Sequence, residues 1–204
     1  MSQRVGIFAG SFDPVHTGHI SFALQAAKEA NLDKVYFLPE IKPRRKESVT
    51  HISHRIAMIN LACKPHNQLV ILELPDKQFS VAKTMPRLKQ HFPEAELFLL
   101  VGADYELTHL ADWPLAEQLL EQFGLIAALR GKARKDVESF IKTLPKPPNG
   151  LYIINSPGAG ISSRDIRTAV ASGKKIDGLL PSVKNYINAN WLYSAVAAVS
   201  NNSE

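Results

Sequence analysis

The stretch GSFDPVHTGHI, from Gly10 to Ile20, contains two histidines three residues apart, His16 and His19. It directly follows the apolar run Val5–Ala9, which has the composition of a buried strand. In open α/β sheets, ligands bind beyond the carboxyl ends of the strands, and this stretch would lie there. Imidazoles at such a position could bind phosphate oxygens.

The residues between this strand and the next helix support an anion site. Asp13 and Pro14 favour a turn, and Thr17 is a suitable N-cap for a helix that begins at Gly18. Gly18 lets a ligand approach the backbone, and the first N–H groups of a helix bind anions. We therefore expect both histidines to face the same phosphate group.

Two other interpretations of the histidine pair stay open at this point. Histidines at this spacing also occur on surfaces or in buried hydrogen bonds, which is our expectation for His51 and His54. A zinc site would use a similar pair, but the chain has one cysteine and no HExxH pattern. That cysteine, Cys63, lies in an apolar helical pattern and is expected to be a buried structural thiol.

A second candidate anion site lies near the other end of the chain, in the string GAGISSRDIRTAV. Ser162 and Asp165 have the S-x-x-D spacing of a helix N-terminus. The functional interpretation is that this N-terminus binds a second anion, with Arg167 as a charged clamp. The alternative is an ordinary capped helix whose arginines are solvated.

Short apolar runs alternate with helical patterns along the chain. This alternation predicts an α/β fold with a Rossmann-like, doubly wound parallel sheet and C-terminal helices, in a single domain of residues 1–204. The expected strands are Val5–Ala9, Lys34–Leu38, Leu69–Glu73, Leu97–Val101, Leu125–Leu129 and Leu151–Ile154. The expected helices are Gly18–Ala30, His51–Ala62, Val81–His91, Pro114–Gln122, Arg134–Lys142, Ser163–Ala171 and Ser182–Asn190. Pro86 lies inside the third helix and makes its start or its continuity doubtful.

Composition narrows the class of protein. Hydrophobic residues make up 45% of the 204 and charged residues 21%, which argues against a disordered chain. The net charge of +5 favours anionic partners such as nucleotides. No aromatic-and-basic stacking pattern supports nucleic-acid binding, and no apolar run reaches the ~18 residues of a membrane span. Since a signal-peptide pattern is missing, a cytoplasmic location is expected.

The first stretch resembles the (T/S)FDPxHxGH signature of the nucleotidyltransferase superfamily, and ISSRDIR resembles its ISSTxIR motif, with Arg164 in place of the threonine. The resemblance implies the nucleotidylyl transferase fold and catalytic roles for His16, His19 and Arg167. It also implies that ATP is bound by Gly10, Ser11, Phe12, His16, Gly18 and His19 of the first motif and by Ile161, Ser162, Ser163 and Arg167 of the second.

The segment from Leu97 to Gly131 resembles the nicotinate mononucleotide adenylyltransferases, in which a strand ending in GxD is followed by a tryptophan and later by an arginine. HRIAMINLA also resembles the second-helix pattern of that family. The resemblance implies that Gly102 and Asp104 bind ATP as well. It implies that the acceptor is bound by Asp13, Thr84, Trp113 and Arg130.

Two segments depart from the pattern of that family. PEIKPRRKES stands where PPHK is usual. Its cations Lys42, Arg44, Arg45 and Lys46 are expected to cover a triphosphate, with Lys42 and Arg45 as ATP ligands. A solvated basic loop is the alternative, and a nucleic-acid patch is a weaker third interpretation. FSVAKTM stands where SYTVDTL is frequent, which keeps only Thr84 and the overall register and leaves the exact acceptor open.

The resemblance implies an enzyme that joins ATP and nicotinate mononucleotide to form deamido-NAD and pyrophosphate. Mg²⁺ would be carried by ATP, and no protein metal site is expected. The alternatives are a related enzyme that takes nicotinamide mononucleotide or another phosphorylated acceptor, and a non-catalytic nucleotide sensor. The expected partners are ATP and a pyridine mononucleotide, with neither nucleic acid nor membrane, and assembly into a homo-oligomer stays open.

Overall fold

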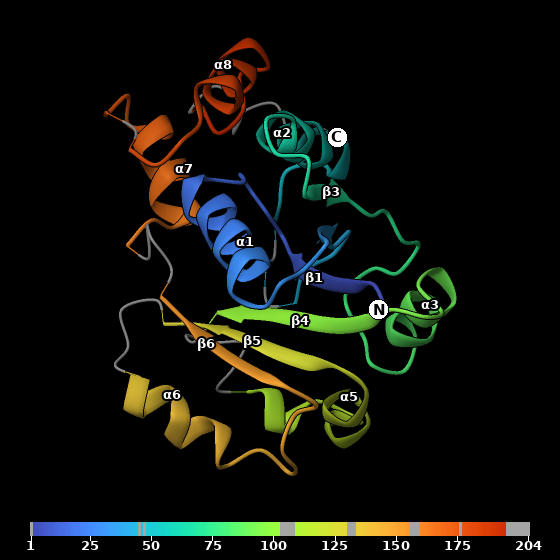
Figure 1. Cartoon of the computed structure of the whole chain (residues 1–204). Coiled ribbons are helices and arrows are strands. Elements are labelled where there is room, and N and C mark those ends of the chain that lie inside the picture. Colours follow the sequence, from blue (N-terminus) through green and yellow to red (C-terminus); the bar gives the residue numbers. More distant parts are fainter. Residues whose placement is uncertain are drawn as a thin grey trace.

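The computed structural model describes residues 2–44, 46, 48–102, 109–129, 134–155, 160–175 and 177–194. These residues form one sheet of parallel strands in the order β3-β2-β1-β4-β5-β6 (Figure 1). The strands are β1 (Arg4–Gly10), β2 (Lys34–Pro39), β3 (Leu69–Ile71), β4 (Glu96–Gly102), β5 (Gly124–Ala128) and β6 (Leu151–Ile154). The predicted α/β fold with a doubly wound, Rossmann-like parallel sheet is confirmed.

Helices connect successive strands and follow the last one. They are α1 (Thr17–Glu29), α2 (Ile52–Cys63), α3 (Thr84–His91), the short 3-10 helix η1 (Leu110–Asp112), α5 (Ala116–Gln122), α6 (Arg134–Ile141), α7 (Ser163–Ala171) and α8 (Pro181–Ala189). In the described part of the chain, none of these helices is both long and apolar enough to cross a membrane.

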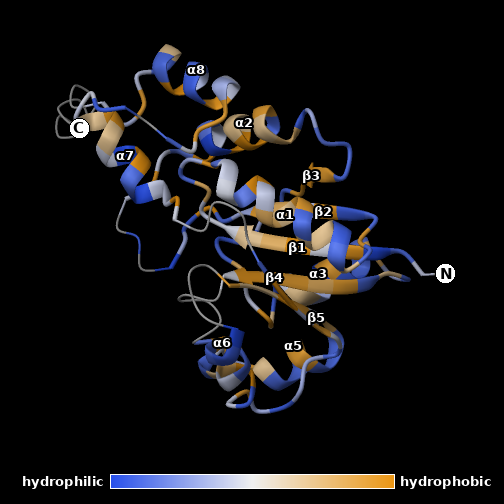
Figure 2. Cartoon of the chain, turned by 60° about the vertical axis from the view of Figure 1, so that its left-hand side comes forward, coloured by the Kyte–Doolittle hydropathy of each residue, from blue (hydrophilic) through white to orange (hydrophobic). Residues whose placement is uncertain are grey.

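The helices cover both faces of the sheet. Figure 1 shows α1, α2, α7 and α8 on one side and α3, α5 and α6 on the other. Because both faces are buried, the central parts of the strands are apolar, and successive residues point into different cores. Val5 and Ile7 belong to the core under α3 and α5, whereas Phe8 belongs to the core under α1 and α2. Figure 2 shows these apolar strands at the centre, between helices with more hydrophilic outer surfaces.

The third helix is shorter than predicted. It begins at Thr84, and Val81–Lys83 form a turn instead. Pro86 is the reason, because proline has no N–H and is tolerated only in the first turn of a helix, where no partner for an N–H is needed. The turn is closed by two hydrogen bonds between Ser80 and Thr84.

The strands except β6 also differ slightly from their predicted bounds, and β1, β2 and β4 are each longer by one residue at one or both ends. β3 ends at Ile71 rather than Glu73, and β5 spans Gly124–Ala128 rather than Leu125–Leu129. β3 lies at the edge of the sheet, where strands are commonly short. None of these differences moves a predicted site residue.

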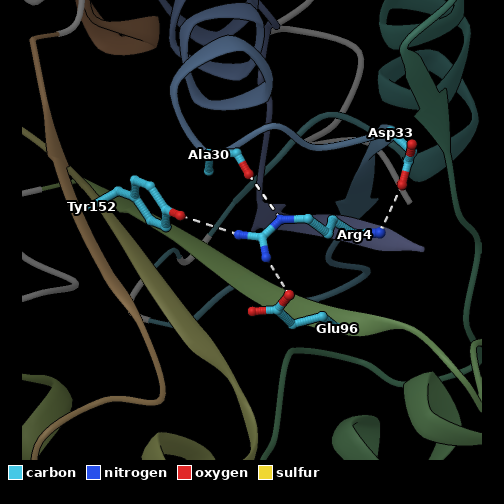
Figure 3. A network of polar contacts seen from close by, with 5 residues as sticks. All are labelled: Arg4, Ala30, Asp33, Glu96 and Tyr152. Carbon is cyan, nitrogen blue, oxygen red and sulfur yellow. Dashed lines mark hydrogen bonds and ion pairs between the residues drawn. The ribbon is translucent and has the colours of Figure 1, made fainter. Parts of the chain in front are cut away.

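A polar network around Arg4 joins the sheet to α1 at the amino ends of the strands (Figure 3). The Arg4 side chain donates to the Ala30 carbonyl at the end of α1 over 3.0 Å and to the Tyr152 hydroxyl on β6 over 3.2 Å. It also forms an ion pair with Glu96 on β4, and its backbone N–H donates to Asp33. This network therefore stabilises the end of the sheet opposite to the ligand-binding edge.

Cys63 is buried at the end of α2. Burial raises the pKa of its thiol to about 12. The thiol therefore stays protonated at neutral pH, as predicted for a structural residue rather than a nucleophile.

Candidate active site

The direction in which the sheet grows changes between β1 and β4. The chain adds β2 and β3 on one side of β1 and then crosses to the other side to form β4. In open α/β sheets, this switch point forms the crevice in which ligands bind. Gly10 ends β1 and Gly102 ends β4, so these two of the glycines predicted to bind ATP lie at this edge of the sheet.

His16 and His19 form a stacked pair at the start of α1. Their ring centroids lie 3.7 Å apart, and the ring planes are inclined by 28°. The backbone N–H of His16 donates to Nδ1 of His19 over 3.2 Å. A neutral imidazole has one donor nitrogen, so this bond places the ring proton of His19 on Nε2. Nε2 is therefore the nitrogen of His19 that can donate to a phosphate oxygen.

The prediction that Thr17 caps this helix is wrong by one residue. Thr17 is the first residue of α1, and its N–H donates to the Gly178 carbonyl over 2.8 Å. The cap lies at His16 because the imidazole of His19, at the third position of the helix, accepts the N–H of the capping residue. The pair predicted to bind phosphate thus also forms the capping box of α1.

Aromatic rings of the first strand and its loop pack against His19. The ring centroid of His19 lies 5.1 Å from that of Phe12 and 5.9 Å from that of Phe8. Phe12 lies over Gly10, where an added Cβ would come within 3.2 Å of its ring. A side chain at Gly10 would therefore displace Phe12 and, with it, the support of His19. The contacts of Gly10 and Phe12 with ATP stay predictions.

The second motif lies against the loop of the first. Ser162 caps α7 and accepts from the N–H of Asp165 over 3.1 Å, as the S-x-x-D spacing predicts. Ser163 donates to the Pro14 carbonyl over 2.9 Å, and Nη1 of Arg167 donates to the Asp13 carbonyl over 2.8 Å. These bonds span about 150 residues of sequence and bring the N-termini of α1 and α7 to one place (Figures 1 and 2).

The carboxylate of Asp13 is engaged by the protein itself. Its side chain is buried, and the residue is only 2% exposed. Oδ1 accepts from the hydroxyl of Tyr193 over 2.6 Å, and Oδ2 accepts from the N–H of Thr50 over 3.2 Å. The structure therefore gives Asp13 a role in holding the loop, and its predicted contact with the acceptor stays a prediction.

Arg55 on α2 belongs to the HRIAMINLA pattern, but the sequence alone assigned it no role. It is 1% exposed, and its guanidinium donates to four backbone carbonyls. The acceptors are Thr50 at 2.7 Å, Ser11 and Glu40 at 2.8 Å each, and Ile41 at 3.1 Å. Arg55 thus joins the loop after β1 to the loop after β2.

A sequence signal for Arg55 was present. Arg55, Met58, Ile59 and Ala62 are all buried, and they have the spacing of one helix face. An arginine on the apolar face of an amphipathic helix is rarely left unpaired, since burying an unpaired charge is costly. That pattern could have indicated a buried arginine with several partners.

The predicted basic loop follows β2 and is attached to the first motif. Lys46 donates through Nζ to the hydroxyl of Ser11 in a short hydrogen bond. Lys42 is exposed, and its backbone N–H donates to the Lys77 carbonyl over 2.7 Å. Arg45 lies outside the described residues. Two lysine ammonium groups therefore belong to a loop at the edge of the site.

Arg44 belongs to the same loop but lies beside Trp113. Its guanidinium carbon is 5.7 Å from the centre of the indole, and Nη2 donates to the Phe79 carbonyl over 3.2 Å. Phe79 in turn packs against Trp113 with ring centroids 5.9 Å apart, and its N–H donates to the Glu40 carboxylate over 2.8 Å. Burial raises the pKa of Glu40 above its ordinary value. A half-buried aromatic face thus lies beside a cation.

Thr84 is fully buried next to this group. Its Oγ1 accepts from the N–H of Ser80 over 3.0 Å. The hydroxyl therefore shapes the turn that follows Phe79, and a direct contact between Thr84 and the acceptor stays a prediction. Asp104 and Arg130 lie outside the described residues, so their predicted contacts with ATP and the acceptor also stay predictions.

The second histidine pair is structural, as expected. His51 caps α2 through a bond from the N–H of Ser53, and Nδ1 of His54 lies 3.0 Å from the hydroxyl of Tyr186 on α8. Within the described residues, no three histidine, cysteine or carboxylate side chains gather as a metal site. The site therefore offers a half-buried aromatic face beside a cation, together with cationic and N–H donors that suit phosphate groups.

Known proteins are similar to this chain over nearly its whole length. The family described as Cytidylyltransferase-like matches residues 7–169. A relative in Carboxydothermus hydrogenoformans, named "Probable nicotinate-nucleotide adenylyltransferase", is 35% identical over 199 residues, which cover 93% of this chain and 98% of the relative. The nicotinate-nucleotide adenylyltransferase of Bacillus subtilis is 33% identical over 199 residues, covering 95% of this chain and all of the relative. The chain belongs to the nicotinate-nucleotide adenylyltransferase family.

The fold of this family member extends to distant relatives of known structure. The nicotinic acid mononucleotide adenylyltransferase of Plasmodium falciparum, complexed with APC, superimposes with a TM-score of 0.77 at 20% identity, covering 94% of this chain and 97% of that one. The same enzyme complexed with NaAD gives a TM-score of 0.76 at 21% identity, with the same coverage of both chains. The fold of this chain is therefore kept where little sequence identity remains.

Proposed function

We propose that the protein transfers the adenylyl group of ATP to nicotinate mononucleotide and forms deamido-NAD and pyrophosphate, a step of NAD biosynthesis. The observation that carries this proposal is the meeting of the His16–His19 pair with the N-terminus of α7, where Arg167 donates to the Asp13 carbonyl. The names of the relatives and the NaAD complex of the Plasmodium enzyme support the same reaction.

The chemistry needs positioning more than proton transfer. The 5′-phosphate oxygen of the mononucleotide attacks the α-phosphorus of ATP, and the bond from this phosphorus to the oxygen bridging to the β-phosphorus breaks. Pyrophosphate leaves opposite the attacking oxygen and takes both electrons of the broken bond. Because a phosphate dianion is already nucleophilic, no general base is required, and stabilising the developing charge is the main task of the site.

Each group of the site has a place in this reaction. His16 and His19 bind oxygens of the reacting phosphate. The N–H groups at the start of α7, with Ser162, Ser163 and Arg167, hold the leaving pyrophosphate. A guanidinium has five N–H donors, so the bond from Arg167 to the Asp13 carbonyl orients the group and leaves donors for phosphate oxygens.

Mg²⁺ belongs to the ATP substrate in this proposal. It binds triphosphate oxygens and water, as magnesium does in many nucleotide sites. The one buried carboxylate of the first motif, Asp13, is already bonded to Tyr193 and Thr50. The described residues therefore suit a magnesium ion that arrives with the nucleotide better than a resident one.

In this proposal, Trp113 and Arg44 make the acceptor site prefer nicotinate mononucleotide to nicotinamide mononucleotide. In this proposal the pyridine ring packs against the indole of Trp113. The guanidinium of Arg44, 5.7 Å from that indole, then attracts the carboxylate of nicotinate but gains little from the uncharged amide of nicotinamide.

The first prediction is therefore an acceptor preference. With ATP, nicotinate mononucleotide should give the highest kcat/KM, and nicotinamide mononucleotide a value lower by at least about tenfold, which is ~1.4 kcal/mol. Arg44→Gln should reduce this ratio while leaving the use of nicotinamide mononucleotide nearly unchanged. The acceptor preference is measured as product formation with a panel of acceptors, each with ATP and with CTP.

Three outcomes of the panel would contradict this assignment. A CTP-dependent product or a preference for phosphopantetheine would point to another enzyme of the superfamily. A preference for nicotinamide mononucleotide would contradict the role of Arg44. ATP binding without release of pyrophosphate for any acceptor would indicate a nucleotide sensor.

A second prediction concerns the basic loop. Replacing Lys42, Arg44, Arg45 and Lys46 together with alanine should raise the KM for ATP by about tenfold or more, because cations next to a triphosphate contribute to its binding. The melting temperature should change little. Lys46→Ala alone should account for much of the effect, since Lys46 contacts Ser11 of the first motif.

Lys135→Ala on α6 is the matched control for Lys46→Ala. It removes the same charge from an exposed position on the other face of the sheet. Its KM for ATP should equal that of the wild type. ATP kinetics that stay unchanged in the fourfold variant would show that the loop is only a solvated surface.

A further inference from the structure

The segment after α8 turns back to the active-site loop. Tyr193 follows Asp13 by 180 residues, yet its hydroxyl donates to Oδ1 of Asp13 over 2.6 Å. Trp191 and Tyr193 both have positive φ, 53° and 61°, which is unfavourable for residues with side chains. Such a conformation persists only where surrounding contacts hold it. The indole of Trp191 is exposed, whereas Tyr193 is turned inward against the core.

Asp13 connects Tyr193 to both motifs of the phosphate site. Its second carboxylate oxygen accepts from Thr50 in the loop before α2, and its carbonyl accepts from Arg167 on α7. It lies three residues before His16, the capping residue of α1. The orientation of Asp13 therefore influences both the histidine pair and the arginine of the second motif.

The bond from Tyr193 also fixes where the charge of Asp13 lies. A carboxylate repels a triphosphate, so it must stay on the scaffold side of the loop. Burial and the neighbouring carboxylate of Asp13 raise the pKa of Tyr193 well above its ordinary value. The hydroxyl thus keeps its proton and remains a donor at any working pH.

We propose that Tyr193 is a positioning residue of this enzyme, whose hydroxyl acts through Asp13 to hold the loop that carries His16 in its reactive geometry. The proposal rests on the proposed function for its kinetic consequences. It assigns a role in the reaction to the segment after α8, which touches neither ATP nor the acceptor in the proposed mechanism.

Tyr193→Phe tests this role, because it removes the hydroxyl and keeps the ring. A misplacement of reacting groups by a fraction of an ångström to 1 Å lowers turnover strongly, so kcat should fall by about tenfold or more. The KM for ATP should rise less than kcat falls, since the backbone N–H groups at the start of α7 and the basic loop are unchanged.

Tyr186→Phe is the matched control. The hydroxyl of Tyr186 lies 3.0 Å from Nδ1 of His54, and both tyrosine rings pack against the same core. The two variants should lose similar thermal stability, but Tyr186→Phe should keep kcat within about twofold of the wild type. Equal kcat values for the two variants would show that Tyr193 is only structural.

Two further measurements decide whether Tyr193 acts through Asp13. In a double-mutant cycle, Tyr193→Phe should add little to the loss caused by Asp13→Ala, whereas fully additive losses would overturn the proposal. Hydrogen–deuterium exchange of residues 10–19 can be measured without turnover. It should be faster in Tyr193→Phe than in the wild type or in Tyr186→Phe. Unchanged exchange in Tyr193→Phe would overturn the proposal whether or not the proposed reaction is right. If the wild type did not catalyse the reaction but Tyr193→Phe still exchanged faster than the wild type, only the proposed reaction would be contradicted.

Discussion

Replacing His19 with alanine should lower turnover by ~2–4 kcal/mol of transition-state stabilisation, the range for one lost donor to a developing oxyanion. The bond from the His16 N–H fixes the neutral ring of His19 with its proton on Nε2. Charge grows on the oxygens of the α-phosphate as the acceptor attacks, so the contact strengthens in the transition state. Turnover should therefore fall more than ATP affinity.

The two ring nitrogens of His19 can be tested separately. His19→Asn offers an oxygen near the position of Nδ1, so it should preserve the cap of α1 and the melting temperature but not the turnover. His19→Gln offers an N–H near the position of Nε2, so it should recover part of the turnover while losing the cap. Loss of the cap costs about 1 kcal/mol of stability. Steady-state kinetics and thermal melts of the three variants measure these effects.

His54→Ala is the control for the histidine experiment. His54 has the same spacing from His51 as His19 has from His16, but it contacts Tyr186 away from the phosphate site. Its turnover should match that of the wild type. A His19→Ala protein with normal turnover, or one that does not fold, would show that His19 is structural.

The sheet could be predicted from sequence because both of its faces are buried. Runs such as Leu97–Val101 are apolar without interruption, and only a covered strand tolerates such a run. The start of α7 was equally readable, since Ser162 and Asp165 form a local cap. In both cases the signal lies within a few neighbouring residues.

Features that depend on one particular side chain were harder to place. The start of α1 was predicted one residue late, because Thr17 is the usual type of cap and a histidine is not. The start of α3 was predicted three residues early. The contact between Ser80 and Thr84 starts the helix at Thr84 and so places Pro86 in its first turn, and the sequence pattern does not show this contact.

The contacts that assemble the site could not be read from the sequence. Arg167 and Asp13 are 154 residues apart, and Tyr193 and Asp13 are 180 apart. No periodicity or spacing links residues at such distances, and the two motifs came together in the prediction only through a family resemblance. The network of Arg55 depends in the same way on loops that the fold alone brings side by side.

Replacing Arg55 with methionine should have the largest effect on stability, about 3–5 kcal/mol of the free energy of unfolding, as when one partner of a buried charged pair is removed. The methionine fills a similar volume but leaves the carbonyls of Ser11, Glu40 and Ile41 without their donor. It also removes one cation near the buried carboxylate of Asp13. The attraction of that carboxylate opposes the lowering of the Arg55 pKa by burial.

Arg55→Lys separates the charge of this residue from its geometry. Lysine keeps the positive charge, but its three donors radiate from one atom and cannot span carbonyls of two loops as a planar guanidinium does. Its loss of stability should be smaller than that of Arg55→Met, whereas turnover should still fall because the loops after β1 and β2 are no longer tied together. Urea unfolding and steady-state kinetics measure the two quantities.

Arg134→Met provides the comparison for Arg55→Met. Arg134 also donates to a backbone carbonyl, that of Ile153 at 2.8 Å, but it is exposed at the start of α6. Since water replaces a lost partner at an exposed site, this variant should lose less than about 1 kcal/mol. If Arg55→Met were as stable and as active as Arg134→Met, the four carbonyls would have other donors, and Arg55 would not be what holds the two loops of the site together.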